Sequence, residues 1–476
     1  MSRLRRWRLP LALAILLVPA QQAQAAALDG AAMNWPFALP FAGLLLTIAL
    51  GPLLFPKIWH AHYGKMAAGW SMAALALVGW FAGGAVTTAA FVHAMLGEYL
   101  SFMILLFTLY TVAGGIVVSG DIKGTPANNV AILLMGSAMA SIVGTTGAAM
   151  ILVRPLIRAN IARPHNTHVL IFFIILVANV GGALSPLGDP PLLVGFLHGV
   201  DFFWTTRNLW LQTLIVVALL ITVFFALDLW RFRAEAFRES PAPREPIRIR
   251  GLVNLLLIGG VIGSILMSAS WRPAIAFEIL GTKLELQNLV RDALLVAMAV
   301  LSLWLTPDEH RQTNSFSWEP IREVAKLFAA IFTAIIPVLA MLDAGREGAF
   351  GWLLTAVTAR DGTPHQVAYF WYTGLLSAFL DNAPTYLLFF NLAGGDPQIL
   401  MGQYAGTLAG ISMGAVYMGA LTYIGNAPNF MVAAIAVERG IRMPSFFGYL
   451  LRASAILIPL FLLLTLLPVA PVLNWN

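Results

Sequence analysis

The stretch Ser185-Pro186-Leu187-Gly188-Asp189-Pro190-Pro191 interrupts an otherwise apolar run over residues 167–199. A second interruption, Gly425-Asn426-Ala427-Pro428, lies in the apolar run 404–440 and aligns with Gly188-Asp189-Pro190-Pro191 at an offset of 237 residues. Proline cannot continue a regular helix, and inside a bilayer a broken helix is tolerated only where it is buried in protein or lines a wet cavity. The two breaks therefore predict related sites inside a membrane protein.

Another pair of breaks supports a repeat. Gly144-Thr145-Thr146-Gly147 interrupts the apolar run 128–160, and Leu380-Asp381-Asn382-Ala383-Pro384 interrupts the run 364–393. Thr145-Thr146 aligns with Asp381-Asn382 at an offset of 236 residues. Because both pairs occur in the same order at nearly the same offset, the sequence indicates two homologous halves.

The composition excludes most soluble classes. Of the 476 residues, 59% are hydrophobic and 11% are charged, whereas soluble proteins carry about a quarter charged residues. There is no cysteine, which removes disulfides and thiolate chemistry. The formal charge of +6 comes largely from Arg3, Arg5, Arg6 and Arg8 at the extreme N-terminus, so no nucleic-acid partner is expected. The lipid bilayer is the expected surrounding of this chain.

The chain divides into four parts. Residues 1–25 have a basic start, an apolar centre and the A-x-A pattern Ala23-Gln24-Ala25, which predict a cleaved signal peptide; an uncleaved first helix is the alternative. Residues 36–230 form the first predicted repeat and residues 251–468 the second. Between them, residues 231–250 are rich in arginine and contain three prolines, which predicts an irregular cytoplasmic linker.

The predicted fold is an all-α polytopic membrane protein built from two inverted-topology repeats. Each half is expected to contain about five transmembrane helices and one re-entrant helical hairpin, with broken helices at the midplane. If both hairpins enter and leave on one side, most Lys and Arg residues fall on the cytoplasmic side, as the positive-inside rule requires. The export signal then predicts a bacterial inner-membrane protein with a periplasmic mature N-terminus. The expected spans are 37–56, 65–83, 98–118, 208–230, 251–269, 288–306, 319–343 and 446–468, besides the four interrupted runs.

Paired breaks in inverted halves point to the central site of a transporter. Asp189 and Asp381 supply charge there, and an intramembrane carboxylate costs about 2.5–3.5 kcal/mol or more, which favours a functional role. The alternative for both is a helix N-cap followed by proline. Neutral ligand oxygens for a bound ion are predicted from Thr145, Thr146, Ser185, Asn382, Thr385 and Asn426.

The segment from Asn179 to Asp189 and the segment Asp381-Asn382-Ala383-Pro384-Thr385 resemble the ion transporter superfamily, which includes citrate and dicarboxylate carriers, arsenite permeases and NhaD-type sodium/proton antiporters. The resemblance is strongest to the antiporter branch and covers about residues 36–468. It implies that the Gly-Asp of the first broken helix carries the cation, and that the protein is a homodimer. Pro190 and Pro191 depart from that branch, where hydroxyl residues follow the Gly-Asp.

The leading functional hypothesis is exchange of Na+, or Li+, for H+ by alternating access, because a buried carboxylate lets protons and metal ions compete for one oxygen cluster. Asp189 would bind Na+ with Thr145, Thr146 and Ser185, and Asp381 would do so with Asn382, Thr385 and Asn426. The alternative is a Na+- or H+-coupled citrate, dicarboxylate or oxyanion carrier, although an acidic tip repels a carboxylate unless a proton or cation neutralises it. No cofactor is expected beyond the transported ions.

An enzyme is the remaining hypothesis. Asp189 and Asp381 could form the dyad of an intramembrane aspartyl protease, because two such carboxylates can share a proton. The sequence Pro186-Leu187-Gly188-Asp189 stands where that chemistry would require G-x-G-D, and an inverted repeat has no purpose in a protease. The sequence therefore predicts a transporter and not an enzyme.

Overall fold

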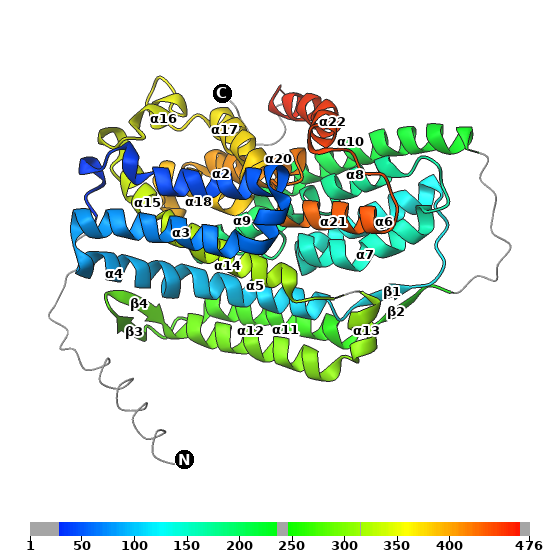
Figure 1. Ribbon diagram of the computed structural model, residues 1–476, viewed down its shortest axis with the longest axis horizontal. Coiled ribbons are helices and arrows are strands. Elements are labelled where there is room, and N and C mark those ends of the chain that lie inside the picture. The colour runs from blue at the N-terminus through cyan, green and yellow to red at the C-terminus, as the bar shows by residue number, and fades with distance from the viewer. Residues whose placement is uncertain (1–27, 236–245, 315, 467–476) are drawn as a thin grey trace, which may run out of the picture.

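Long apolar helices form the body of the protein. The computed structural model describes residues 28–235, 246–314 and 316–466 (Figure 1). Within these ranges, eight helical segments are long and apolar enough to cross a membrane, and a ninth is added if one bent helix pair counts as a single span. The protein is thus an all-helical, multi-pass membrane protein, as predicted. The predicted signal peptide, residues 1–25, lies outside the described residues.

The described part of the first half contains nine α-helices. Short 3-10 turns precede them at Gly30–Ala32 and Trp35–Phe37, and another lies inside the broken helix at Val180–Leu184. The helices are α2 (Leu39–Leu54), α3 (Pro56–Ala82), α4 (Gly84–Val92), α5 (Leu100–Ala113), α6 (Pro126–Val143), α7 (Thr145–Asn160), α8 (Thr167–Leu176), α9 (Pro190–Leu197) and α10 (Trp204–Ala234).

The second half contains twelve α-helices in the described residues. The 3-10 turns are Gly345–Glu347 and Gly419–Leu421. The helices are α11 (Val253–Ser270), α12 (Leu286–Leu305), α13 (Asp308–Thr313), α14 (Glu319–Ala334), α15 (Ile336–Asp343), α16 (Gly351–Ala356), α17 (Gln366–Phe379), α18 (Asn382–Leu392), α19 (Pro397–Met401), α20 (Ala405–Met418), α21 (Ala427–Glu438) and α22 (Phe446–Leu466).

The third span differs from its prediction. It was expected at 98–118, but helix already begins at Gly84 and runs through a π-helical turn, His93–Tyr99, to Ala113. The polar residues of that turn masked the helix in the hydropathy pattern. The π-helical turn keeps the chain helical between α4 and α5, so the span begins earlier than the hydropathy pattern indicated.

Two antiparallel strand pairs lie at opposite ends of the helices (Figure 1). β1 (Val117–Ser119) pairs with β2 (Arg248–Arg250), so the end of the predicted irregular linker 231–250 is a strand. The start of that linker is helical as well, because α10 continues to Ala234. β3 (Ala276–Ile279) and β4 (Thr282–Glu285) form a hairpin. Both residues of its turn have positive φ, as a two-residue hairpin loop requires.

The predicted hairpins fold back within one or two residues. α6 and α7 are joined only by Gly144, and at the other end Asn129 and Asn160 exchange side-chain hydrogen bonds of 3.0 and 2.7 Å. α17 and α18 turn back in the same way through Leu380 and Asp381. In each hairpin the broken point therefore lies at the tip.

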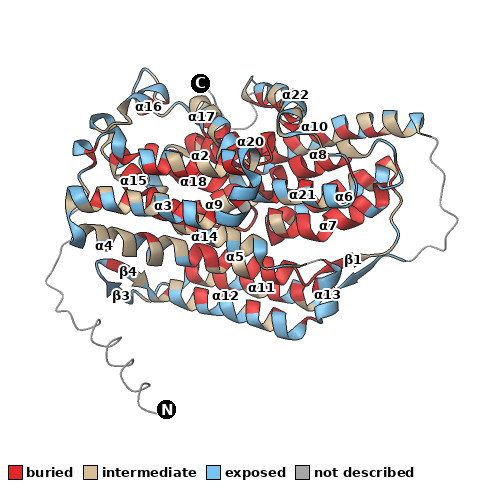
Figure 2. Ribbon diagram, in the orientation of Figure 1, coloured by how far each residue is buried: buried red, intermediate tan, exposed pale blue. Residues whose placement is uncertain are grey.

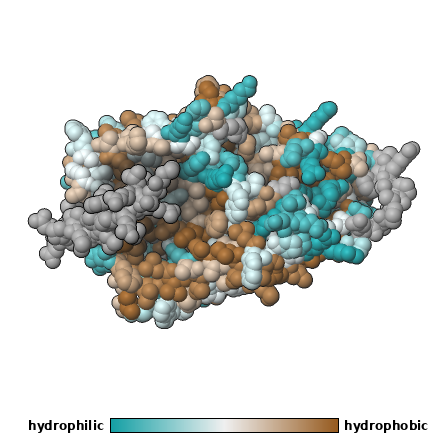
Figure 3. All heavy atoms as spheres, turned by 60° about the horizontal axis from the view of Figure 1, so that its bottom comes forward, coloured by the Kyte–Doolittle hydropathy of each residue, from teal (hydrophilic) through white to brown (hydrophobic). Residues whose placement is uncertain are grey.

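The hairpins and broken helices form the buried centre. Figure 2 shows buried residues along α7, α8 and α20, while α3 and α12 carry many exposed positions. The exposed side chains of the outer helices are largely apolar, Trp80 on α3 and Trp304 on α12 among them. In Figure 3 hydrophobic side chains cover much of one face, and hydrophilic ones gather toward the right-hand end. This distribution suits a body surrounded by lipid.

Candidate functional site

All four breaks meet at one cavity. Helices α7, α9, α18 and α21 each begin at a break, and residues at or next to each of these starts line a common space of about 100 Å³. The first turn of a helix carries a partial positive charge. Proline stands in the first turns of α9, α18 and α21, so those turns have fewer free backbone N–H groups than usual. Four such ends around one cavity make it a favourable place for a negative group.

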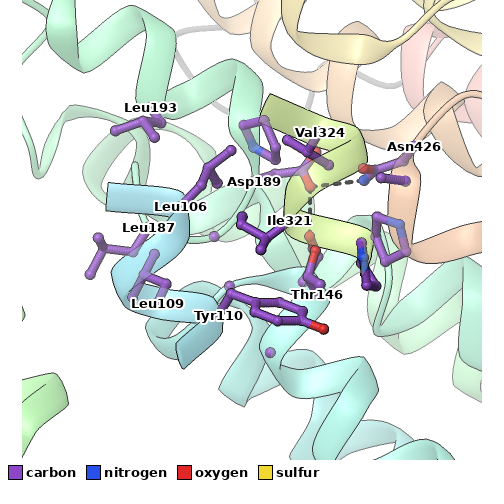
Figure 4. Close-up of a pocket in the computed structure, with 18 of the residues that line it drawn as sticks. Leu106, Leu109, Tyr110, Thr146, Leu187, Asp189, Leu193, Ile321, Val324 and Asn426 are labelled. Carbon is purple, nitrogen blue, oxygen red and sulfur yellow. Dashed lines mark hydrogen bonds between the residues drawn. The ribbon is translucent and has the colours of Figure 1, made fainter. Parts of the chain in front are cut away.

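Asp189 is the negative group at this position. Its side chain is buried, and Oδ1 accepts hydrogen bonds from the Thr145 hydroxyl at 2.8 Å and from Asn426 Nδ2 at 2.8 Å (Figure 4). Its Oδ2 accepts from Asn382 Nδ2 at 2.5 Å. All three donors are neutral, and no Lys or Arg appears among the described residues that line the cavity. The carboxylate is thus held in place without a fixed counter-charge.

The two acidic residues play different local roles. Asp189 stands at the N-cap position of α9, but its side chain makes no capping hydrogen bond. The Asp381 carboxylate accepts from the backbone N–H of Ala383 at 3.2 Å and caps α18. The N-cap alternative therefore describes Asp381, whereas the contacts of Asp189 come from other parts of the chain. Both residues line the same cavity.

The remaining predicted ligands divide between the cavity and the backbone. Thr146 lines the cavity (Figure 4). Ser185 donates to the backbone oxygen of Ser141 and accepts from the Leu187 N–H, so its hydroxyl holds the broken helix to α6. Thr385 donates to the backbone oxygen of Asp381 at 3.0 Å, one turn back along α18. Two of these residues, Asn382 and Asn426, were predicted to bind the ion together with Asp381. In the structure their side-chain amides donate to Asp189 instead.

This arrangement revises the alignment of the halves. Thr145 is the first residue of α7 and Asn382 the first of α18, so these two residues correspond. Their spacing equals the 237 residues between Asp189 and Asn426. The offset of 236 used to pair Thr145 with Asp381 is therefore wrong by one residue. One offset relates both breaks, and Gly144 is the counterpart of Asp381.

Two buried asparagines complete the site. Asn179 donates to Asn429 Oδ1 at 2.7 Å and accepts from Asn426 Nδ2 at 3.3 Å. Asn429 in turn donates to the backbone oxygens of Gly419 and Thr422 at 2.8 and 2.9 Å. Asn179 was not predicted as a site residue. The only sequence signal was an amide inside an apolar run, which is compatible with a purely structural role.

Close backbone contact shapes both broken helices. A Cβ placed on Gly188 would lie 2.0 Å from the carbonyl oxygen of Gly182, and one on Gly425 would lie 2.5 Å from that of Gly419. Glycine is thus required where the chain folds back on itself. The loops place Asp189 and Asn426 at the same point of their respective halves.

The walls of the cavity are apolar, and a second cleft continues from it. Leu106, Leu109 and Tyr110 of α5 face Ile321 and Val324 of α14 (Figure 4). The adjoining cleft, of about 400 Å³, shares several lining residues with the cavity. Its charged lining side chains are all acidic in the described part of the chain: Glu319, Glu323, Asp381 and Glu438. A cation reaching the site would therefore be attracted along this route.

One buried cation lies close by. Arg154 on α7 is 8% exposed, and its Nε and Nη1 find no hydrogen-bond partner among the described residues. Its electrostatic neighbours include Tyr110, which lines the cavity, and Glu438, which lines the cleft. Unpaired donors on a buried guanidinium are costly. Arg154 itself is not among the residues that line the cavity or the cleft. Arg154 was not among the predicted site residues.

A family model described as "Putative citrate transport" matches residues 30–469. The chain belongs to this family. An uncharacterized transporter of Mycobacterium bovis and one of Mycobacterium tuberculosis are each 25% identical over 339 residues, which cover 67% of this chain and 71% of the relative. The predicted transport class is thereby confirmed at the level of the family. The antiporter branch of the resemblance stays a prediction.

Proposed function

We propose that the protein is a secondary carrier for a citrate-type carboxylate, driven by H+ or Na+ that binds at Asp189. The observation that carries this proposal is a buried carboxylate, held by three neutral donors, at the point where four broken helices of a citrate transport family member converge. An ionised Asp189 repels a carboxylate substrate. A proton or Na+ on Asp189 removes that repulsion, which couples the two ligands.

The groups that would hold each ligand are separate. For the ion they are Asp189, Thr145 and the Asn382 amide, whose Oδ1 has no partner among the described residues. For the substrate carboxylates they are the positive ends of the broken helices that face the cavity. The ion site thereby lies next to the substrate, as coupling requires.

We further propose that the two halves are inverted repeats that move by alternating access. The packing supports this. α3 and α12 are the second spans of their halves, and α5 and α14 belong to the third spans. The third span of each half packs on the second span of the other, because α5 contacts α12 and α14 contacts α3. The hairpins and broken helices would move against these four helices. The proposal includes a homodimer in a bacterial inner membrane, with the arginine-rich end in the cytoplasm and the mature N-terminus in the periplasm.

Na+/H+ exchange, or Li+/H+ exchange, is the second candidate. The observation that favours it is the acidic cleft leading to Asp189, whose walls attract cations and repel free carboxylates. The protease alternative has less support. No hydrogen bond joins the carboxylates of Asp189 and Asp381, both of which the structure describes, whereas a protease dyad shares a proton.

Two assays on the same membranes separate the candidates. Inside-out vesicles from cells without their own antiporters carry a respiration-driven pH gradient, and dye fluorescence is followed after addition of NaCl, LiCl, KCl or citrate. Labelled citrate uptake is measured in whole cells in parallel. The proposal predicts citrate uptake that depends on H+ or Na+ and is absent in Asp189→Asn. Collapse of the gradient by Na+ or Li+ without any citrate uptake would assign exchange instead.

A further inference from the structure

A second cavity, of about 490 Å³, lies between α8, α10 and α22, and it shares no lining residue with the cavity at Asp189. Its lining includes the apolar residues Ile171, Phe172, Leu227 and Ile456. It also includes four basic side chains: His165, His168, Arg231 and Arg452. No acidic residue is among its described lining residues. The cavity is therefore amphipathic and electropositive.

Within the described part of the chain, neither Arg231 nor Arg452 forms a salt bridge with the acidic groups around it. Asp228, on α10, is already engaged by Arg163 at 2.7 Å, by His168 at 2.9 Å and by Asn129 at 2.9 Å. Glu235 is paired with the same Arg163 at 2.9 Å. Arg231 Nε is buried without a hydrogen-bond partner among the described residues. Positive charge thus remains available inside the cavity.

The cavity also lies at the right depth for a lipid head group. Arg231 follows the long apolar segment of α10, and its guanidinium lies 5.2 Å from the ring of Trp230, which is 64% exposed. Tryptophan and arginine at the end of an apolar span mark the membrane interface. Basic pockets between transmembrane helices at this level are suited to phosphate head groups.

We propose that this cavity binds a phosphate-bearing anion, namely the head group of an anionic phospholipid. Arg231 and Arg452 hold the phosphate, because guanidinium groups donate pairs of hydrogen bonds to its oxygens. An acyl chain lies along Leu227 and Ile456. The lipid bridges α10 and α22, the last helix of each half, and thereby ties the two halves together at this end.

The test is native mass spectrometry of the full-length protein in detergent, titrated with phosphatidylglycerol or phosphatidylcholine. Arg231→Gln/Arg452→Gln should bind phosphatidylglycerol about 30-fold more weakly, which is roughly fivefold for each lost charge. Arg233→Gln is the matched control, because Arg233 lies on the same helix turn but is exposed and does not line the cavity. It should bind as the wild type does.

Three results would overturn the proposal. These are equal wild-type binding of phosphatidylcholine, unchanged phosphatidylglycerol binding by the double variant, or competition by soluble glycerol phosphate at the same concentration as the lipid. The last would make the ligand a soluble phosphate. If the double variant does not fold, Arg452→Gln alone serves, because Arg452 is exposed, and about fivefold weaker binding is expected.

Discussion

Asp189 and Asn426 occupy the same position in the two broken helices, yet only one of them carries charge. Each directly precedes a helix, α9 or α21, and each follows a hydroxyl residue, Ser185 or Thr422, that bonds to a backbone oxygen of the neighbouring hairpin. The two side chains meet at 2.8 Å. At this point of the two broken helices the local arrangement is the same, and the difference between carboxylate and amide places one ionisable group at the centre.

The hairpin tips differ in the opposite sense. Gly144 and Asp381 are the counterparts, and here the second half carries the charge. Asp381 has an ordinary φ of −55° and uses its carboxylate to cap α18, whereas Gly144 has a φ of +83° and makes no side-chain cap. The charge at the tip serves as a helix cap, and the charge at Asp189 caps nothing. This contrast is the reason for assigning ion coupling to Asp189.

Neutralising Asp189 should have the largest effect. Asp189→Asn keeps the size of the side chain and removes the ion site, so gradient-driven uptake of labelled citrate into proteoliposomes should fall about 100-fold. The protein should still elute as a folded species in gel filtration. Asp361→Asn is the control, because Asp361 lies in an exposed loop where an amide can also accept the hydrogen bond from the Thr363 N–H. Full uptake by Asp189→Asn would refute the assignment.

Exchanging the two residues tests whether the halves are equivalent. Asp189→Asn/Asn426→Asp restores one carboxylate at the centre but moves it away from Thr145 and Asn382. Because small displacements of a binding group cost heavily, uptake should stay about tenfold or more below the wild type. The same uptake assay measures it. Wild-type uptake by the exchanged variant would mean that only the presence of the charge matters.

At Asp381, capping and charge can be separated. Asn also caps helices, so Asp381→Asn should leave the thermal unfolding temperature nearly unchanged. Asp381→Ala should lower the free energy of unfolding by about 1 kcal/mol. The negative charge beside the cavity attracts the coupling cation. Its loss should therefore lower uptake about tenfold in both variants. Equal stability of the two variants would show that the cap contributes little.

At the other tip, the expected effect is on stability alone. Gly144 has φ +83° and ψ 152°, a region that is essentially restricted to glycine, so Gly144→Ala should destabilise the protein by about 1–3 kcal/mol. The control is Gly263→Ala on α11, where an added Cβ meets no atom within 4 Å. That control should be neutral or slightly stabilising. Unchanged stability of Gly144→Ala would mean that the tip relaxes to another backbone conformation.

The sequence predicted where the helices break, because Gly, Pro and Asp clustered inside an apolar run do not fit an uninterrupted membrane helix. It could not predict that Thr145 and Asn382 converge on one carboxylate, since this depends on how the two hairpins pack and on a register one residue away from the visible alignment. It also missed the pairing of β1 with β2, whose residues are far apart in the chain. Arg154 was missed because its lack of partners becomes visible only in the packed structure.

The central claim, that Asp189 couples an ion to the substrate, is tested most directly by citrate binding to the purified protein at a series of proton and Na+ concentrations. If the coupling ion must occupy Asp189 before citrate binds, the wild-type affinity should rise with one of these ions, and Asp189→Asn should have lost that dependence. Titration of citrate itself affects both proteins equally and cancels in the comparison. An identical ion dependence in the two proteins would contradict the account.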